Sequence, residues 1–375
     1  MSALTKPASS RLSYEQARGC DQEVEAAVVR VCEAAWRGRL RALIATGSLV
    51  RRETLWQQQP DGLRRLSGDA EFIAICHRPL PSNPMQLCRE IETQLRNCGL
   101  VAKTEIQPAT ARYLKGLGGQ IFSYELRTRG RVLTGDAKVL EFIPAIPVSR
   151  EDAWRLLAHR LLEWMEVKVH KAEPMGLRYA LCKLYADMAT SLLVFAECYA
   201  PSYRERQQAL RNWAARASRD WQLWAERADR ALSCKLGECD LTEMEARIWE
   251  RHAIPDTKQL WSWEMDHLMD LPAGSFHPSM LASWSTRLPW RLRARGWFQY
   301  LHACNGLRLG GWMRCWQGRQ TTPRYWVYRG LNDWLYGNQT APWLPMPRLT
   351  EIGENAEWER ALVENYRRYL VLTRA

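Results

Sequence analysis

The sequence predicts an α+β fold in two domains, a mixed-sheet domain over residues 1–146 and a mainly α-helical, tryptophan-rich domain over residues 147–375. Short apolar runs alternate with helical patterns over residues 14–140, and such alternation is typical of helices packed on a sheet. In the second domain the apolar spacing is helical, and 15 of the 19 tryptophans lie at or beyond Trp213. A subdivision near residue 240 stays open, because regular helical spacing is lost beyond it.

Composition narrows the classes of protein to which this chain can belong. The mean hydropathy is −0.41 and no apolar run approaches the ~20 residues that span a bilayer, so we expect no membrane partner. The N-terminal stretch MSALTKPASSRLSYEQ lacks the apolar core of a secretory signal, which predicts a cytoplasmic protein. The 11 cysteines are scattered without a CxxC pair, which favours reduced thiols over a zinc site. The net charge of +12 favours anionic partners, nucleic acid among them.

Six elements are expected in the first domain before residue 108. Prolines and glycines separate them, and the apolar period distinguishes helix from strand. In chain order they are a helix over 14–38, a strand over 41–46, a polar loop over 49–68, a strand that begins with Asp69, a helix over 85–98 and a strand over 100–107.

The stretch from residue 108 to residue 136 is expected to complete the sheet. Residues 108–120 are rich in glycine and basic residues, which predicts a loop. The alternation in IFSYELRTRGRVLTGD, residues 121–136, predicts two strands around a tight turn at Arg129-Gly130. Glu125 lies in the first of these strands.

The second domain is expected to be helical up to about residue 240. Ser149 to Asp152 resemble a capping box that begins a helix. The helices are predicted over residues 150–168, 176–199 and 203–233.

Asp69 and Glu71 are the first candidate site residues. In a strand, residues i and i+2 point to the same side, so the two carboxylates lie next to each other. Two such carboxylates repel one another unless a cation lies between them. Gly47-Ser48 ends the preceding strand and offers backbone N–H groups and a hydroxyl to a phosphate. Two exposed acids on an ordinary pair of strands are the structural alternative.

The order Gly-Ser, loop, Asp-x-Glu on a strand and a later strand acid resembles the DNA polymerase beta-like nucleotidyltransferase superfamily. The matching residues are Gly47, Ser48, Asp69, Glu71 and Glu125. The resemblance implies a palm domain in which these three acids are catalytic and bind two Mg²⁺ or Mn²⁺ ions, while the Gly-Ser turn binds the β- and γ-phosphates. It also implies transfer of NMP from a nucleoside triphosphate, with ATP as the first candidate, to an unknown hydroxyl acceptor with release of pyrophosphate.

Two basic residues are candidates for contacts with the triphosphate. Arg52 lies in the long loop after the Gly-Ser turn, where it is placed to shape the nucleotide pocket. Lys183 is the second candidate, because helices packed behind the catalytic domain of this superfamily often send a basic residue to the phosphates. An ion pair with Asp187, four residues further along the same predicted helix, is the alternative for Lys183.

Two departures from the family pattern leave the activity open. The loop over residues 49–68 is longer than usual, and Glu71 stands where Asp is commoner, which alters metal geometry. The alternative function is therefore a catalytically silent regulatory protein that binds nucleotide or RNA on the same fold. The tryptophans interleaved with arginines in the second domain are either a hydrophobic core or a stacking platform for nucleic-acid bases.

Overall fold

The computed structural model describes residues 10–78, 84–170, 173–303, 312, 315–316, 318–337 and 355–371. The chain divides into two compact units. The first consists of Met1–Asp152, Tyr199–Ala209 and Leu236–Cys239, and the second of Ala153–Cys198, Leu210–Lys235 and Asp240–Ala375. Two short segments from the helical half of the sequence thus belong to the unit that contains the sheet.

The first unit contains a six-stranded sheet, which confirms the α+β class. The central strand β4 (Arg64–Cys76) pairs antiparallel with β2 (Leu40–Thr46) at one edge and parallel with β5 (Leu100–Thr110) at the other. Three shorter strands extend the sheet by antiparallel pairing, namely β3 (Trp56–Gln58) on β4, β1 (Ser10–Arg11) on β3 and β6 (Arg131–Gly135) on β2.

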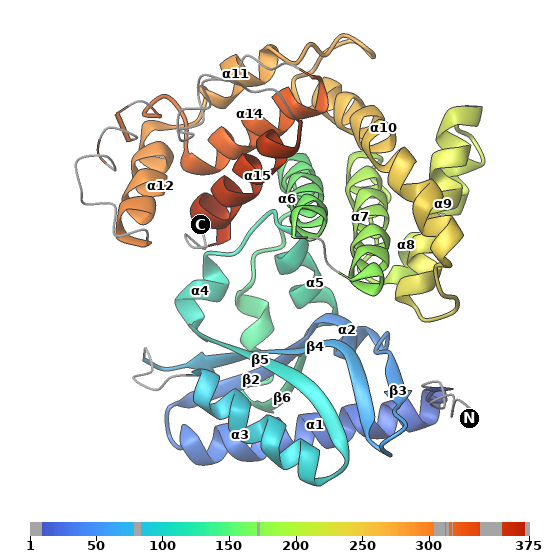
Figure 1. Cartoon of the computed structure of the whole chain (residues 1–375). Helices are drawn as coiled ribbons and strands as arrows, with labels where there is room; N and C mark the ends of the chain where they lie inside the picture. Colours follow the sequence, from blue (N-terminus) through green and yellow to red (C-terminus); the bar gives the residue numbers. More distant parts are fainter. Residues whose placement is uncertain are drawn as a thin grey trace. The chain divides into compact units, whose positions relative to one another are not determined.

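Two long helices cover one face of this sheet (Figure 1). They are α1 (Tyr14–Ala35), which begins with a capping box, and α3 (Pro84–Asn97). Val28 of α1 and Ile91 of α3 are fully buried with Phe72 of β4 in one apolar core. Burial of this core is the main stabilising contribution on this face.

Three short elements cover the opposite face, namely α4 (Ala111–Lys115), α5 (Ile121–Arg129) and the 3-10 helix η1 (Val139–Phe142). Leu114 and Leu126 pack there in a second core with Ile44, Ile73 and Ile75. Because side chains alternate along a strand, β4 serves both cores with successive residues.

The prediction of two strands over residues 121–136 is wrong in its first half. Ile121–Arg129 form α5, and only Arg131–Gly135 form a strand. Gln120 and Ser123 cap the start of α5, and the N–H of Gly130 closes its end on the carbonyl of Leu126. A stretch this short fits helix and strand about equally well, and burial of Leu126 in the second core decides for the helix. Glu125 therefore lies on a helix.

The segment predicted as a loop over residues 49–68 is largely regular structure. The short helix α2 (Gly47–Arg51) follows β2 directly, and β3 forms a hairpin with the first residues of β4. Trp56 of β3 is buried, and its indole donates a hydrogen bond to Asp21 of α1. The extra length in this segment therefore builds a strand pair that packs on the unit.

Helices make up the rest of the described chain (Figure 1). They are α6 (Arg150–Val169), α7 (Pro174–Phe195), α8 (Tyr203–Ala214), α9 (Arg219–Lys235), α10 (Glu243–Leu268), α11 (Met280–Ser285), α12 (Trp290–Ala303), α14 (Pro323–Leu335), α15 (Asn355–Tyr366) and the π-helical turn η2 (Arg367–Val371). The single helix predicted over 203–233 is in fact two, α8 and α9. No helix within the described ranges is long and apolar enough to span a membrane.

The second unit has an aromatic core. Trp154 contacts the rings of Trp261, Trp284, Tyr325 and Tyr328, with ring centroids 5.0, 5.7, 6.0 and 5.1 Å away. Trp154 and Trp261 are completely buried. The interpretation of the tryptophans as core residues therefore holds for this cluster.

Candidate functional site

Asp69 and Glu71 lie on β4 and point to the face of the sheet that also carries Ile73 and Ile75. Ala70, between them, points to the opposite core. The two isoleucines are buried in the core that α4 and α5 complete, whereas Asp69 is half-buried and Glu71 is exposed. The two carboxylates thus lie on the same face of β4 as the buried isoleucines, at the end of the strand where this face is open to solvent.

A third acid, Glu105, shares this face. In the parallel pairing of β4 with β5, Glu105 is in register with Glu71, and Lys103 with Asp69. Residues in register on neighbouring strands point to the same face of the sheet. Lys103 Nζ donates to Asp69 Oδ2 at 3.1 Å and to Glu105 Oε1 at 2.7 Å. We call Asp69, Glu71 and Glu105 the acidic patch.

Gly47 places the Gly-Ser turn directly against the acidic patch. The preceding residue, Thr46, is in register with Glu71. Gly47 has a φ of +68°, and a Cβ at this position would lie 2.5 Å from Glu71 Oε2. The positive φ therefore favours glycine, and any larger residue would also displace the end of the Glu71 side chain. The hydroxyl of Ser48 has no hydrogen-bond partner in the described part of the chain and is available to a ligand.

The surroundings of Glu71 raise the pKa of its carboxyl group. Although Glu71 as a whole is exposed, its carboxylate lies against Gly47 and loses hydration there, which is the largest cause, and the positive charge of Arg51 opposes it. The carboxylates of Glu105, Asp69 and Glu125 raise this pKa further. Carboxylates that raise one another's pKa form an unfavourable cluster of charge, which a bound cation relieves.

The acidic patch offers carboxylate oxygens, the donor type that Mg²⁺ and Mn²⁺ prefer, but in the structure Lys103 bridges two of its three acids. Among the residues that the structure describes, no three His, Cys, Asp or Glu side chains form a ready metal site. The ammonium of Lys103 lies between Asp69 and Glu105, and this side chain is 61% exposed. Its rotation into solvent needs no repacking, and the three carboxylates left behind are the oxygen ligands that Mg²⁺ and Mn²⁺ prefer.

Glu125, the third acid that the sequence predicts for the metal, is occupied by protein groups instead. Arg51 Nη1 donates to its Oε2 at 2.8 Å, and Tyr199 OH donates to its Oε1 at 2.5 Å. Arg206 Nη2 also donates to Oε1, and the side chains of Arg51 and Arg206 are almost fully buried. A carboxylate with three such donors is a structural anchor, so the geometry favours Glu105 over Glu125 as the third acid.

The same contacts fix α2 and with it the Gly-Ser turn. Arg51, the last residue of α2, also donates through Nε to Glu53 Oε2 at 3.0 Å. Glu53 Oε1 in turn accepts from the backbone N–H of Arg204 at 3.2 Å. All of these residues belong to the first unit. We call Arg51, Glu53, Glu125, Tyr199 and Arg206 the Glu125 network.

Arg52, predicted to contact phosphates, lies at the end of α2. Its backbone is left-handed with a φ of 57°, and its side chain is exposed. It lines a pocket of about 180 Å³ in the first unit together with Arg18, Asp21 and Trp56. No residue of the acidic patch lines this pocket, so phosphate binding by Arg52 stays a prediction.

Lys183 lies on α7 in the second unit. Its Nζ is 3.7 Å from Glu163 Oε2. Asp187, the partner considered from the sequence, accepts instead from Arg160 Nε at 2.5 Å. A contact of Lys183 with triphosphate stays a prediction.

The sequence does carry a signal for Glu105. It stands between Thr104 and Ile106, both buried, in a strand that the apolar alternation predicts correctly. Glu71 shows the same pattern, because it stands between the buried Ala70 and Phe72. The pairing of β5 with β4, which puts Glu105 beside Glu71, has no local signature.

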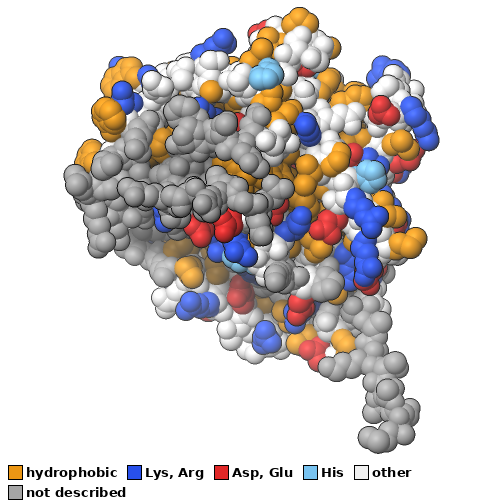
Figure 2. All heavy atoms as spheres, turned by 45° about the horizontal axis from the view of Figure 1, so that its top comes forward, with side chains coloured by type: hydrophobic (Ala, Val, Ile, Leu, Met, Phe, Trp, Pro, Cys, Tyr) orange, Lys and Arg blue, Asp and Glu red, His pale blue; other side chains and the backbone are white. Residues whose placement is uncertain are grey.

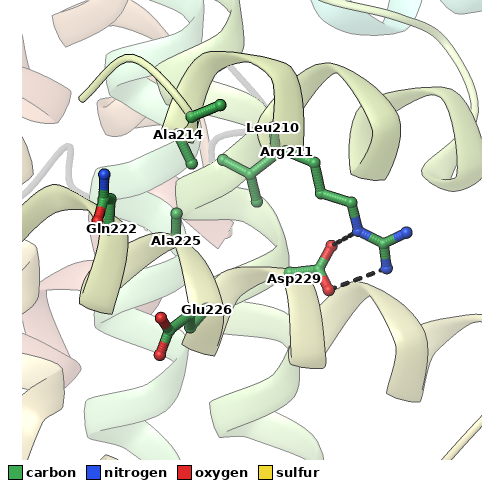
Figure 3. A pocket seen from close by; sticks show the side chains of 8 residues that line it. Leu210, Arg211, Ala214, Gln222, Ala225, Glu226 and Asp229 are labelled. Carbon is green, nitrogen blue, oxygen red and sulfur yellow. Dashed lines mark hydrogen bonds and ion pairs between the residues drawn. The ribbon is translucent and has the colours of Figure 1, made fainter.

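The second unit has a pocket of about 290 Å³ between α8 and α9 (Figure 3). Apolar side chains such as Leu210, Ala214 and Ala225 line much of it. Arg211 donates to both carboxylate oxygens of Asp229, at 2.7 and 3.0 Å, so these two charges compensate each other. None of the residues predicted for the site lines this pocket.

Comparison of the sequence with family models and with curated proteins found no match. The interpretation of the acidic patch therefore depends on the geometry of its own residues.

Proposed function

We propose that the chain is a metal-dependent nucleotidyltransferase with a polymerase beta-like palm domain. It transfers NMP from a nucleoside triphosphate, with ATP as the first candidate, to a hydroxyl acceptor and releases pyrophosphate. The observation that carries this proposal is the acidic patch, in which Asp69, Glu71 and Glu105 share one sheet face beside Gly47. Three carboxylates next to a glycine turn with an unpaired hydroxyl provide what such a transfer requires.

Each residue of the site has a separate task in this reaction. The three carboxylates would hold Mg²⁺ or Mn²⁺, and the bound cation would neutralise phosphate charge and lower the pKa of the acceptor hydroxyl. Gly47, with no side chain, lets a phosphate approach, and the hydroxyl of Ser48 donates to a phosphate oxygen. The acceptor oxygen bonds to the α-phosphorus, the bond from that phosphorus to pyrophosphate breaks, and a carboxylate of the patch takes the acceptor proton.

Lys103 has two positions in this proposal. Without a cation its ammonium bridges Asp69 and Glu105. A cation held by the three carboxylates would repel the ammonium of Lys103, which would then be free to pair with the triphosphate.

The decisive experiment is a screen of each nucleoside triphosphate with Mg²⁺ or Mn²⁺ and a panel of hydroxyl acceptors, with mass detection of the product. We expect pyrophosphate release that Asp69→Ala abolishes and Glu105→Gln lowers at least about 100-fold. Glu141→Gln, an exposed acid of the first unit outside the patch, is the matched control and should keep full activity. Pyrophosphate release that survives Asp69→Ala would falsify the metal assignment.

The position of Lys103 supports a second candidate, a catalytically silent protein that binds nucleotide or RNA. Hydrogen bonds to Glu105 and Asp69 raise the pKa of Lys103. The lysine therefore stays protonated, and its positive charge compensates the two acids without a metal ion. If this candidate is right, ATP binds with the same affinity with and without divalent cations. The affinity of Lys103→Ala for ATP should likewise be the same with and without divalent cations. Calorimetric titration of ATP in magnesium and in EDTA separates the two candidates.

A further inference from the structure

α12 presents aromatic and arginine side chains to solvent. Trp290, Leu292 and Phe298 are 66%, 50% and 69% exposed. Arg291 and Arg295 are exposed beside them. Figure 2 shows orange hydrophobic and blue basic side chains side by side at several places on the face that it presents. Soluble proteins rarely leave this many large apolar groups together in water unless they bind something.

A neighbouring turn adds to this exposed face. Arg293 of α12 donates through Nη1 to the carbonyl oxygens of Arg319 and Gln320, at 3.3 and 3.1 Å, and so fixes the turn beside the helix. Trp316 is 67% exposed, and the guanidinium of Arg319 lies 4.3 Å from the centre of its ring. We call Trp290, Arg291, Arg295, Phe298, Trp316 and Arg319 the α12 surface.

In the stretch of sequence that contains α12, the Lys, Arg, Asp and Glu side chains have one sign of charge. From Leu271 to Asn332 the sequence contains no Asp, Glu or Lys, but it contains the arginines Arg287, Arg291, Arg293, Arg295, Arg308, Arg314, Arg319, Arg324 and Arg329. Within the described ranges no carboxylate pairs with Arg291 or Arg295. These guanidinium groups therefore lack the compensating acids that an ordinary solvated face provides.

We infer that the α12 surface binds single-stranded nucleic acid. Unpaired bases stack on exposed aromatic rings, here Trp290, Phe298 and Trp316, while arginines bind the phosphates between them. A guanidinium binds phosphate through two parallel hydrogen bonds and also stacks on bases, which an ammonium does not do. The stretch from Leu271 to Asn332, whose basic residues other than histidine are all arginine, therefore suits single-stranded nucleic acid.

The arrangement of the same side chains argues against a lipid surface. A helix that lies in a membrane interface keeps its apolar side chains on one face and its charges on the other. In α12 the apolar face, with Trp297 and Tyr300, is buried in the unit, and the exposed face mixes Trp290 and Phe298 with Arg291. Anionic vesicles are therefore the competing ligand in the test.

The test measures binding of the full chain to fluorescently labelled single-stranded RNA and DNA of about 20 nucleotides by fluorescence anisotropy. We expect Trp290→Ala combined with Phe298→Ala to weaken binding about tenfold or more. Arg291→Gln combined with Arg295→Gln should flatten the dependence of log affinity on log salt by about 0.7 for each phosphate that these arginines no longer neutralise. Duplexes and vesicles of anionic lipid should bind more weakly than the single strands.

Matched controls come from exposed residues of α10. Met244→Ala combined with Ile248→Ala removes exposed apolar side chains away from the α12 surface, and Arg247→Gln removes an exposed arginine there. These variants should bind single strands like the parent chain, and so should Asp69→Ala, which disables only the proposed catalytic site. Thermal unfolding checks that the α12 variants are folded. Unchanged affinity in those variants, or binding to vesicles but not to single strands, overturns the inference.

Discussion

At the scale of single residues, the fold alters the protonation of Asp21. Its carboxylate on α1 accepts hydrogen bonds from Thr54 Oγ1 at 2.8 Å and from Trp56 Nε1 at 2.9 Å. Both hydrogen bonds favour the charged form, but burial outweighs them and raises the pKa of Asp21 to about 6. The folded chain therefore holds a proton on this residue at a pH where the unfolded chain has lost it.

The first prediction concerns the pH dependence that Asp21 causes. In the unfolded chain an Asp titrates near about 3.9, so between about pH 4 and pH 6 the folded state binds more protons than the unfolded state. The free energy of unfolding should fall as pH rises through this window, and Asp21→Asn should remove that slope. At pH 7 the variant should be more stable by about 1–2 kcal/mol, because no charge is buried. Chemical unfolding of both proteins from about pH 4 to pH 8 measures this, and parallel curves would contradict it.

At the scale of one element, α2 depends on Gly47. An alanine there meets two obstacles, the positive φ of +68° and the contact of 2.5 Å with Glu71 Oε2. We expect Gly47→Ala to lower the free energy of unfolding by about 1–3 kcal/mol and to abolish the proposed nucleotidyl transfer, because Glu71 must move. Denaturant unfolding and pyrophosphate release measure the two effects.

Gly38 supplies a matched control for that prediction. Its φ is +72°, but nothing lies within 4 Å of a Cβ placed there. Gly38→Ala should therefore show the backbone strain alone, with activity retained. Equal losses of activity in the two variants would mean that Gly47 matters only for the backbone.

The Glu125 network joins α2, α5 and Tyr199–Ala209, and its removal should be felt as lost stability. Glu125→Gln leaves the buried guanidinium groups of Arg51 and Arg206 without their counter-charge. We expect a loss of about 3 kcal/mol in the free energy of unfolding, since breaking a buried pair costs about 3–5 kcal/mol. Glu105→Gln, on the exposed sheet face, should lose less than about 0.5 kcal/mol. The opposite order of stability in denaturant unfolding would make Glu125 a candidate metal ligand again.

At the scale of the whole molecule, the cysteines that the structure describes are all free thiols. Cys98 is exposed, whereas Cys20 and Cys32 are fully buried and burial raises the pKa of Cys32 to about 12. Thiolates and not thiols react with alkylating reagents, so Cys98 should be modified first and Cys32 only on unfolding. Mass spectrometry after timed alkylation gives the order, and a reductant should leave the unfolding midpoint unchanged. Early labelling of Cys32 would contradict the described core.

The sequence by itself determined those features that depend on the spacing of apolar residues within one helix or strand. The α+β class, the long helices and strands α1, β2, α3 and β5, and the placement of Asp69 beside Glu71 follow from apolar spacings of 3.6 and 2. The glycine that ends β2 is equally local, since its turn needs a positive φ.

Tertiary structure alone decided which third acid joins the first two. Glu105 reaches the acidic patch because β5 pairs with β4, and Glu125 leaves it because Leu126 draws residues 121–129 into a helix against the second core. Tyr199 and Arg206, which are more than 70 residues from Glu125 in the sequence, donate hydrogen bonds to its carboxylate. Strand order and burial are set by contacts between residues that are far apart in the sequence. Such contacts produce no periodic pattern of apolar residues, so they could not be predicted from the sequence.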